Sequence, residues 1–387
     1  MTRPLLNRRL DGLGNSIFGE MSARAVATAS INLGQGFPDV DGPPSVAQAA
    51  AEAVLTGRGN QYPPATGIPE LRQAVARHQR RFYGLTYDPD TEVLITAGAT
   101  EAIAAALLAL LEPGDEVIAF EPYYDSYVAN IAMAGATRVP LTLKAPDFRP
   151  DLDALKRKIT GKTRLLLLNS PHNPTGMVLT REETEAIADL AMTHDLLVVT
   201  DEVYEHLTYD RAHIPFATIP GMGERTVSVS SAGKAFSFTG WKVGWVTGTP
   251  EIVNAVRTTK QFLTYVSSGP FQYAVAEALD LPDEYFANLA GGLRERRDLL
   301  ASGLKDIGFG VYHPDGTYFI TTDIAPLGEQ DAMEFCLALP DRAGVVAIPS
   351  AVFYDDKEAG RTQVRFAFCK RPEVLKEALG RLSVLAG

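Results

Sequence analysis

The chain has 387 residues, 46% of them hydrophobic and 21% charged, which is typical of a globular protein large enough for two subdomains that share one active site. Its net charge of −11, with no cluster of Lys and Arg, argues against a nucleic-acid partner and favours small-molecule ligands. Only two cysteines occur, Cys336 and Cys369, so we expect no disulfide framework, no metal site and a cytoplasmic location. Neither a secretory signal nor a membrane span is expected, because the longest apolar run, residues 102–111, is too short.

Short apolar segments alternate with longer helical patterns along the chain, which is typical of an α/β fold. The expected strands cover residues 92–96, 116–120, 164–169, 196–201, 226–230 and 243–248. Several of them are apolar without alternation, so helices should cover both faces of their sheet.

The segment after residue 179 has a helix start signal of its own. Thr180 followed by Glu183 is a capping box. An apolar stripe follows at Ile187, Leu190 and Ala191. The segment therefore predicts the crossover helix of a βαβ unit.

The charged, periodic segment 283–308 predicts a long helix. Its pattern contains Gly291 and Gly292, where we expect an interruption. This helix would lead into a second, smaller α+β domain.

Polar groups follow the first two expected strands. The sequence ITAGATEA turns through Gly98 into a helix, so the N–H groups of Ala99 and Thr100 would form an anion site that suits a phosphate. A glycine turn without a ligand is the commoner explanation of such a segment on its own. Tyr124, after residues 116–120, could stack on a planar ligand, although a single aromatic residue more often fills the core.

The next two expected strands also end in polar residues. In SPHNPTG, two prolines stiffen the loop around Asn173, although an Asn-Pro pair alone is more often only a turn. Asp201 ends an apolar strand three residues before Tyr204, and a buried carboxylate there needs a cationic partner. A helix-capping role for Asp201 is an equally good explanation in isolation.

The stretch SSAGKAFSFTGWKVGW contains Ser231 and two lysines, Lys234 and Lys242, in unusually apolar surroundings. Together with the preceding residues they suit one ligand with a phosphate, a protonatable aromatic nitrogen, a ring hydroxyl and an aldehyde. Pyridoxal 5'-phosphate (PLP) has all four groups. The sequence therefore predicts PLP as the cofactor.

Each of these residues then has an expected role. Lys234 would form the Schiff base with the aldehyde and later abstract the substrate α-proton, as a base whose pKa is lowered. Asp201 would pair with the pyridinium nitrogen. Asn173 and Tyr204 would hydrogen-bond the ring oxygen. The phosphate would be held by four groups: Ser231, Lys242 and the amides of Ala99 and Thr100.

Nine motifs, in order, resemble those of the class I aminotransferases, the fold-type I PLP enzymes similar to aspartate aminotransferase. They are NLGQGFPD, NQYPPATGIPELR, TAGATEA, EPYYDSY, SPHNPTG, TDEVYEHL, SSAGKAFSFTGWKVGW, GTYF and VRFAFCK. The resemblance implies a mostly parallel seven-stranded sheet flanked by helices in a large PLP-binding domain, and a smaller α+β C-terminal domain. It further implies an N-terminal arm at 1–45 packed on the small domain, the large domain at 46–285 and the small domain at 286–387.

The resemblance also implies roles for residues outside this constellation. Arg365 matches the arginine that grips the substrate α-carboxylate, and Gly36 matches a backbone contact to the same group, beside Asn173. Tyr62 matches a tyrosine that reaches the phosphate of the neighbouring subunit, which implies a homodimer with shared active sites. Phe18 stands where kynurenine aminotransferases carry a substrate-facing tryptophan.

The implied activity is transfer of an amino group between an L-amino acid and a 2-oxo acid, with 2-oxoglutarate and glutamate as the expected pair. Within the family, the chain is most similar to the kynurenine aminotransferases and the actinobacterial N-succinyldiaminopimelate aminotransferases. The segments ITAGATEAIAAALLALLEPGDEV and FCLALP favour the latter, so we expect N-succinyl-LL-2,6-diaminopimelate, an intermediate of lysine biosynthesis, as the substrate.

Several alternatives stay open. The chain could be a broad kynurenine, methionine or glutamine aminotransferase, or a cysteine-conjugate β-lyase that uses the same residues. A non-catalytic PLP-binding regulator is a more remote alternative. A dinucleotide-binding dehydrogenase is weaker still, because no G-x-G-x-x-G motif follows the first expected strand.

Overall fold

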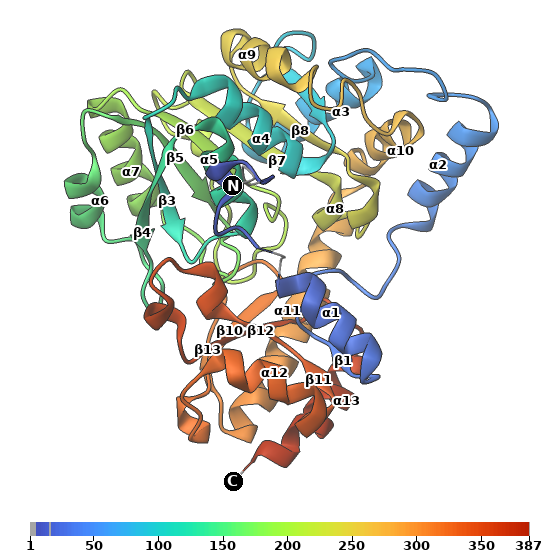
Figure 1. The fold of residues 1–387 in the computed structure, drawn as a ribbon. Coiled ribbons are helices and arrows are strands. Elements are labelled where there is room, and N and C mark those ends of the chain that lie inside the picture. Colours follow the sequence, from blue (N-terminus) through green and yellow to red (C-terminus); the bar gives the residue numbers. More distant parts are fainter. Residues whose placement is uncertain (1–4, 15–16, 387) are drawn as a thin grey trace.

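The computed structural model describes residues 5–14 and 17–386. Residues 1–4, 15, 16 and 387 belong to the predicted arm and C-terminal domain and lie outside the described residues. Figure 1 shows a larger upper part around one sheet and a smaller lower part, with the blue helix α1 (Ile17–Ala27) beside the orange and red C-terminal elements. No described helix is long and apolar enough to cross a membrane.

The larger part is built on a seven-stranded sheet in the order β2-β8-β7-β6-β5-β3-β4. Its strands are β2 (Val93–Thr96), β3 (Glu116–Glu121), β4 (Thr137–Thr142), β5 (Thr163–Asn169), β6 (Leu197–Asp201), β7 (Thr226–Ser231) and β8 (Gly244–Thr247). All run parallel except β8, which pairs antiparallel with both β2 and β7. This sheet confirms the predicted mostly parallel α/β fold.

Six of these strands are predicted from the sequence, and β4 is the one that is not. It is an edge strand that pairs only with β3, and most of its side chains are half-buried or exposed. It also contains Pro140, which an edge strand tolerates because one side of its backbone needs no ladder partner. Such a strand needs no continuous apolar run, so the pattern used for the other six does not detect it.

Helices cover both faces of the sheet, as expected. One face packs against α4 (Gly98–Leu110), α5 (Asp125–Ala134) and α9 (Pro250–Lys260). The other face packs against α3 (Pro69–Tyr83), α7 (Arg181–Thr193) and α10 (Gly269–Leu279), with α2 (Pro44–Leu55) and α6 (Leu152–Lys158) outside them. Within β5, Leu165 and Leu167 face the first layer, whereas Leu166 and Leu168 face the second. Burial on both faces explains the apolar runs.

The predicted capping box forms at the start of α7. The side-chain oxygen of Thr180 accepts a hydrogen bond from the Glu183 amide at 3.1 Å, and the Glu183 carboxylate accepts one from the Thr180 amide at 2.9 Å. Ile187 and Ala191 are buried as predicted, but Leu190 is only half-buried. The buried face of α7 consists of Thr184, Ile187, Ala188 and Ala191, so it does not include Leu190.

The smaller part has a four-stranded antiparallel sheet and a two-stranded parallel one. Their strands are β12 (Ile348–Pro349), β13 (Gln363–Ala367), β10 (Phe319–Asp323) and β9 (Gly310–Tyr312), then β1 (Ile31–Asn32) with β11 (Val345–Val346). Helices α1, α11 (Asp283–Ile307), α12 (Ala332–Ala343) and α13 (Pro372–Leu382) share one core with these strands. The N-terminal arm thus packs on C-terminal elements.

The shortest helices complete the described chain. They are α8 (Ala232–Ala235) and the 3-10 helices η1 (Arg8–Leu10), η2 (Phe216–Thr218), η3 (Thr239–Trp241), η4 (Ala325–Leu327), η5 (Ser350–Phe353), η6 (Lys357–Gly360) and η7 (Ser383–Leu385).

The expected interruption of the long C-terminal helix is wrong. Helix α11 continues through Gly291 and Gly292, because its face at Leu293, Leu300 and Leu304 is buried in the core, and this burial outweighs a propensity cost of about 1 kcal/mol per glycine. The helix also runs across the predicted boundary at residue 285, so the exact domain limits stay a prediction.

Candidate active site

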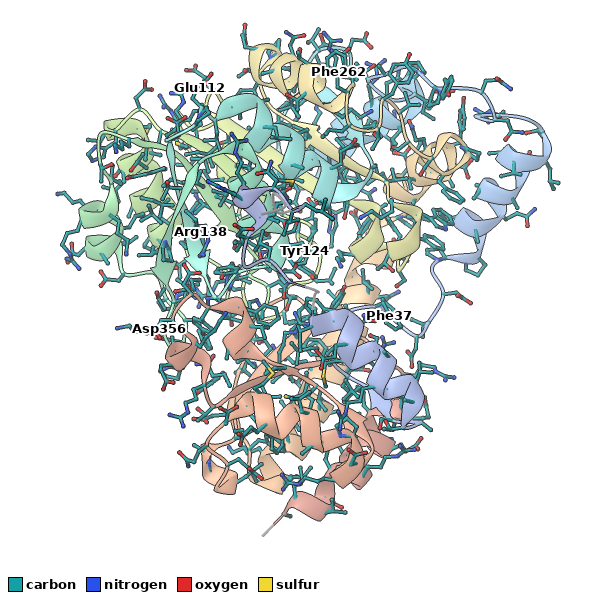
Figure 2. The ribbon with its side chains drawn as sticks, in the orientation of Figure 1. Phe37, Glu112, Tyr124, Arg138, Phe262 and Asp356 are labelled. Carbon is teal, nitrogen blue, oxygen red and sulfur yellow. The ribbon has the colours of Figure 1, made fainter. Side chains whose placement is uncertain are left out.

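A cavity of about 350 Å³ opens beside the carboxyl ends of the parallel strands, where doubly wound sheets place their ligands. Tyr124 and Phe37, two of its lining residues, lie near the level where the upper and lower parts of the molecule meet, whereas Phe262 lies at the top of the view (Figure 2). All predicted site residues except Tyr62 line this cavity: Phe18, Gly36, Ala99, Thr100, Tyr124, Asn173, Asp201, Tyr204, Ser231, Lys234, Lys242 and Arg365. Residues from both parts of the molecule therefore share one site.

Lys234 lies in the one-turn helix α8, directly after β7. Its Nζ donates a hydrogen bond to the hydroxyl of Tyr318 at 3.0 Å and lies 5.6 Å from the ring centres of Tyr204 and Tyr318. Burial lowers the pKa of Lys234 to about 8, although the charge of Asp201 opposes this shift. The amine is thus held in a fixed direction and is easily made neutral.

Asp201 is the last residue of β6 and is buried. Its Oδ2 accepts a hydrogen bond from the Tyr127 hydroxyl at 2.6 Å, and its other oxygen accepts one from the Val203 amide at 3.3 Å. Burial raises the pKa of the carboxyl, and these two hydrogen bonds oppose the rise. Within the described chain no Lys, Arg or His forms an ion pair with Asp201, so the cavity presents a carboxylate in need of a cation.

The opposite end of the cavity gathers groups that suit an anion. Helix α4 begins at Gly98, and its N-cap residue Ala97 offers no side-chain acceptor to the first helical amides. A Cβ on Gly98 would lie 3.4 Å from the Lys242 Nζ, so the lysine approaches the helix start closely. Lys242 itself has a left-handed backbone, with φ of 54°. Together with the Ser231 hydroxyl, these groups form a phosphate-sized donor set.

Arg365 lies on β13 and is buried beside the cavity. Its Nη1 donates to Asn173 Oδ1 at 3.0 Å, its Nη2 donates to the Gly34 carbonyl at 2.8 Å, and its Nε has no hydrogen-bond partner among the described residues. The guanidinium lies 4.0 Å from the Phe319 ring centre. Burial lowers its pKa to about 10, so it stays charged at neutral pH. No ion pair between Arg365 and a carboxylate forms among the described residues, so this buried cation suits an anionic ligand.

Comparison with known proteins identifies the family to which the chain belongs. The family model of aminotransferase class I and II matches residues 28–382. The chain belongs to this family. The aminotransferase is 53% identical, over 98% of both chains, to the probable N-succinyldiaminopimelate aminotransferase DapC of Mycobacterium tuberculosis. It is 39% identical, over 97% of both chains, to the methionine aminotransferase of Escherichia coli.

Solved structures agree with the sequence relatives. That of the N-succinyldiaminopimelate aminotransferase from Mycobacterium tuberculosis matches with a TM-score of 0.96 over 98% of this chain and 100% of the other. An aspartate aminotransferase from Thermus thermophilus matches with a TM-score of 0.91 at 34% identity over 99% of this chain and 100% of the other. The protein is therefore a PLP-dependent transaminase whose substrates are an amino acid and a 2-oxo acid. This membership decides against the dehydrogenase alternative.

The donor set of the aminotransferase fits PLP. The uncapped start of α4 suits the phosphate, and the buried Asp201 lacks the cation that a protonated ring nitrogen would supply. The buried Lys234 amine lines the same cavity, where it can react with an aldehyde.

Four further residues of the site are missed by the sequence prediction. Tyr127 binds the Asp201 carboxylate, and Asn169 donates to the Asp201 carbonyl at 2.8 Å and accepts from the Asn173 amide at 2.7 Å. Tyr318 accepts from Lys234 and donates to the Gly36 carbonyl at 2.6 Å. Gln35 lines the cavity. Tyr318 lies in the GTYF motif and Tyr127 in EPYYDSY, so both residues could have been proposed for the site from the motifs that contain them.

Tyr62 is the one predicted site residue that lies outside the cavity. Its side chain is 83% exposed and contacts the ring of Tyr265 edge-on at 5.8 Å. Close to Tyr265 in the sequence, Phe262 is also 83% exposed and Leu263 is 47% exposed. This exposed aromatic and aliphatic group leaves Tyr62 available to another surface.

Proposed function

We propose that the aminotransferase transfers the amino group of N-succinyl-LL-2,6-diaminopimelate to 2-oxoglutarate, as a cytoplasmic enzyme of lysine biosynthesis. The observation that carries this proposal is the 53% identity, over 98% of both chains, to a relative named for that substrate. The identity to the methionine aminotransferase of Escherichia coli is lower, at 39%.

The predicted cofactor roles are proposed for the residues that meet in the cavity. The amides of Ala99 and Thr100, with Ser231 and Lys242, would hold the phosphate. Asp201 would bind the ring nitrogen and Tyr124 would stack on the ring. Because Asn173 turns its Oδ1 toward Arg365, its amide nitrogen is left to donate, with Tyr204, to the ring oxygen. Bound PLP supplies a reactive aldehyde and an electron-withdrawing ring.

The chain's own residues then position the substrate and move the proton. Arg365 offers its unpartnered Nε and its neighbouring nitrogen to the substrate α-carboxylate, next to the backbone of Gly36. Lys234 takes the proton from the α-carbon at Nζ, which requires the neutral amine, and its pKa of about 8 supplies this form near neutral pH. Phe18 and the aromatic lining exclude water from the reacting atoms.

A homodimer completes the proposal. The exposed rings of Tyr62 and Tyr265 lie in contact, and their burial against a second copy would place Tyr62 at the partner's phosphate site. This would account for the exposed position of Tyr62, which is otherwise unusual for a large aromatic side chain.

The test compares the rates at which amino donors change the visible absorbance of the PLP-loaded enzyme. N-succinyl-LL-2,6-diaminopimelate, methionine, kynurenine and glutamate are each mixed with enzyme at equal concentration. The proposal predicts that the succinylated donor reacts at least tenfold faster than the others, a difference of about 1.4 kcal/mol in transition-state binding. A faster reaction of methionine or kynurenine would contradict it.

Two other outcomes would reassign the activity within the same site. The broad aminotransferase alternative is favoured by the methionine-specific relative and by the aromatic lining at Phe18, Phe37 and Phe319. A cysteine-conjugate β-lyase would release pyruvate and ammonia without a second oxo acid. Both products are therefore measured with a cysteine conjugate in a parallel reaction.

A further inference from the structure

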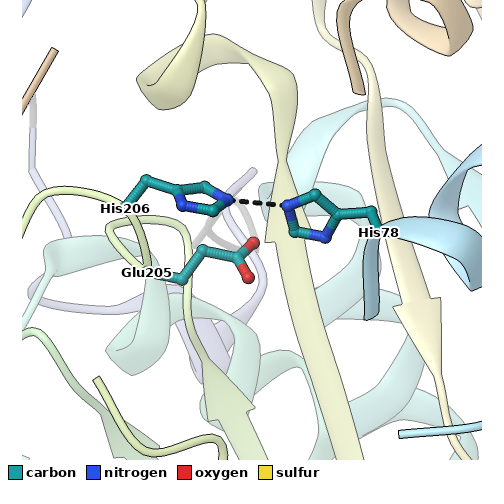
Figure 3. A group of neighbouring side chains, drawn as sticks. All are labelled: His78, Glu205 and His206. Carbon is teal, nitrogen blue, oxygen red and sulfur yellow. Dashed lines mark hydrogen bonds between the residues drawn. The ribbon is translucent and has the colours of Figure 1, made fainter. Parts of the chain in front are cut away.

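Two buried side chains, His78 and Glu205, and the half-buried His206 meet outside the active-site cavity (Figure 3). His78 comes from α3, and Glu205 and His206 come from the turn that follows β6. The Nε2 atoms of the two histidines form a hydrogen bond at 2.7 Å, and one ligand atom from each of the three residues lies within 4.8 Å of the others. None of these residues lines the active-site cavity.

Glu205 is a buried carboxylate without a cation. It is 6% exposed, and its Oε1 accepts a hydrogen bond from the Ser230 hydroxyl at 2.5 Å. Its Oε2 has no hydrogen-bond partner among the described residues. No Lys, Arg or His of the described chain forms an ion pair with Glu205. Arg81, whose charge acts on both histidines, is paired with Asp283. A buried charge of this kind is costly unless a cation joins it.

The two imidazoles are neutral and packed in an apolar shell. Burial lowers the pKa of His78, with Glu205 opposing and Arg81 assisting the shift, and burial also lowers the pKa of His206. The Phe82 ring lies 4.9 Å from His78 and 4.7 Å from His206, and the Phe286 ring lies 4.3 Å from His206. A neutral imidazole has one nitrogen lone pair for a metal ion, and the proton that the two Nε2 atoms share in their hydrogen bond has to move to the Nδ1 atom of its ring.

We propose that His78, Glu205 and His206 bind one divalent transition-metal ion of the Zn²⁺ type. Two histidine nitrogens and one carboxylate oxygen form a donor set that Zn²⁺ accepts, with a fourth position left for water. At Zn–N distances of about 2.0–2.1 Å, tetrahedral binding opens the two Nε2 atoms to about 3.3 Å, a small rotation from the present 2.7 Å. The ion supplies the positive charge that Glu205 lacks.

The surroundings support entry and orientation of the ion. His206 is half-buried, which gives the ion a path from solvent, whereas His78 is 2% exposed. The Gln79 amide lies 3.4 Å from His78 Nδ1, and with its oxygen turned inward it accepts the Nδ1 proton and leaves Nε2 free to ligate. The hydroxyl of Tyr83, whose pKa is raised by burial and then by Glu205, stays protonated beside the carboxylate.

The ion joins elements that lie far apart in the sequence. It fixes α3 to the turn after β6, and the Glu205–Ser230 hydrogen bond extends this connection to β7, one residue before Ser231. Its role is therefore to stabilise the fold behind the cofactor-binding turn, not to take part in transamination. The proposal is independent of which amino donor the enzyme uses.

The test measures metal binding to the untagged, PLP-loaded enzyme. After dialysis against a chelator, the enzyme is equilibrated with Zn²⁺ and passed through a desalting column, and zinc and PLP are quantified per subunit. We expect one bound Zn²⁺ per subunit and a melting temperature that rises with Zn²⁺ concentration. Loading with Co²⁺ should produce the strong visible bands of four-coordinate cobalt, beyond the PLP absorbance. Absence of both stoichiometric zinc and these bands would overturn the proposal.

Variants assign the ligands. His78→Gln and Glu205→Gln should weaken Zn²⁺ binding by more than about 100-fold, because loss of a residue that only orients a ligand already costs roughly 10- to 100-fold. His194→Gln, which removes an exposed histidine at the end of α7, should bind zinc like the wild type. Equal zinc binding by His78→Gln and wild type would refute the site. If a variant fails to retain PLP, the Co²⁺ spectrum of the wild-type enzyme alone shows whether the metal site exists.

Discussion

At the scale of single residues, the environment of Lys234 sets the pH range of the reaction. Burial lowers its pKa from 10.5 to about 8, so roughly one amine in ten is neutral at pH 7, against fewer than one in a thousand for an unperturbed lysine. Because the neutral amine is the proposed base, we expect single-turnover rates to rise about tenfold per pH unit below pH 8 and to level off above it. A rate that is flat between pH 6 and pH 8 would contradict this role of the amine.

Tyr318 positions that amine. Its hydroxyl donates its proton to the Gly36 carbonyl, so it can only accept a hydrogen bond from Lys234. This contact directs an N–H group of Lys234 toward Tyr318 and the nitrogen lone pair away from the Tyr318 ring. We expect Tyr318→Phe to lower kcat about tenfold, with unchanged PLP content, as the loss of one hydrogen bond of about 1.4 kcal/mol would do.

A second measurement separates positioning from a merely structural effect. The ammonium form of Lys234 loses an acceptor in Tyr318→Phe, so the rising limb of the pH profile should move below pH 8. Tyr312→Phe is the matched control, since its hydroxyl donates a long hydrogen bond to Asp323, at 3.4 Å, and Tyr312 does not line the cavity. An unchanged kcat and pH profile in Tyr318→Phe would show that the contact does not matter.

The sequence predicts which residues lie together in the cavity where a polar residue follows an apolar strand. Asp201, Asn173 and Lys234 meet in one cavity because parallel strands end at the same edge of the sheet. Tyr127 and Asn169 are missed because their importance depends on contacts with Asp201, 74 and 32 residues away. Spacing along the chain contains no trace of such contacts.

At the scale of elements, α11 shows how tertiary burial decides a segment that propensity leaves weak. The pattern predicts its limits correctly, but not its continuity through Gly291 and Gly292. Strand β4 is the opposite case, because an edge position and Pro140 hide a real strand from the same pattern. Segments buried on one defined face are therefore predictable, whereas those at an edge depend on the neighbour that pairs with them.

The glycines of α11 offer a test of this view. A Cβ on Gly291 meets nothing within 4 Å, so Gly291→Ala should stabilise the enzyme by about 0.5–1 kcal/mol, by reducing the freedom of the unfolded chain. Gly308, with φ of 114° at the end of the same helix, is the contrasting control, and Gly308→Ala should destabilise. Urea unfolding midpoints measure both, and a destabilised Gly291→Ala would contradict the prediction.

At the scale of the whole molecule, the exposed Tyr62 predicts sites shared between two subunits. Lys234→Ala removes the base, and Tyr62→Asp would place a negative charge at the partner's phosphate site, so each variant alone should be inactive. Coexpression of the two chains produces hybrid dimers in which one site has both native residues. If half of the dimers are hybrids, about one quarter of wild-type activity should return.

This complementation distinguishes the two possible arrangements. If Tyr62 served its own subunit, each site of a hybrid dimer would contain one defect, and no activity would return. Separately purified variants mixed without subunit exchange are the control.

The part of the cavity around Arg365, the proposed substrate side, connects an N-terminal segment with a C-terminal strand. Arg365 binds the Gly34 carbonyl, and the Ala367 amide binds the Leu33 carbonyl at 2.7 Å, whereas the residues predicted to hold the cofactor of their own subunit all lie between positions 99 and 242. During synthesis at about 5–20 residues per second, the ribosome needs roughly 6–25 s to move from residue 242 to residue 365. If the proposed roles hold, the nascent enzyme completes its cofactor-holding segments well before Arg365, the proposed carboxylate-binding residue, is made.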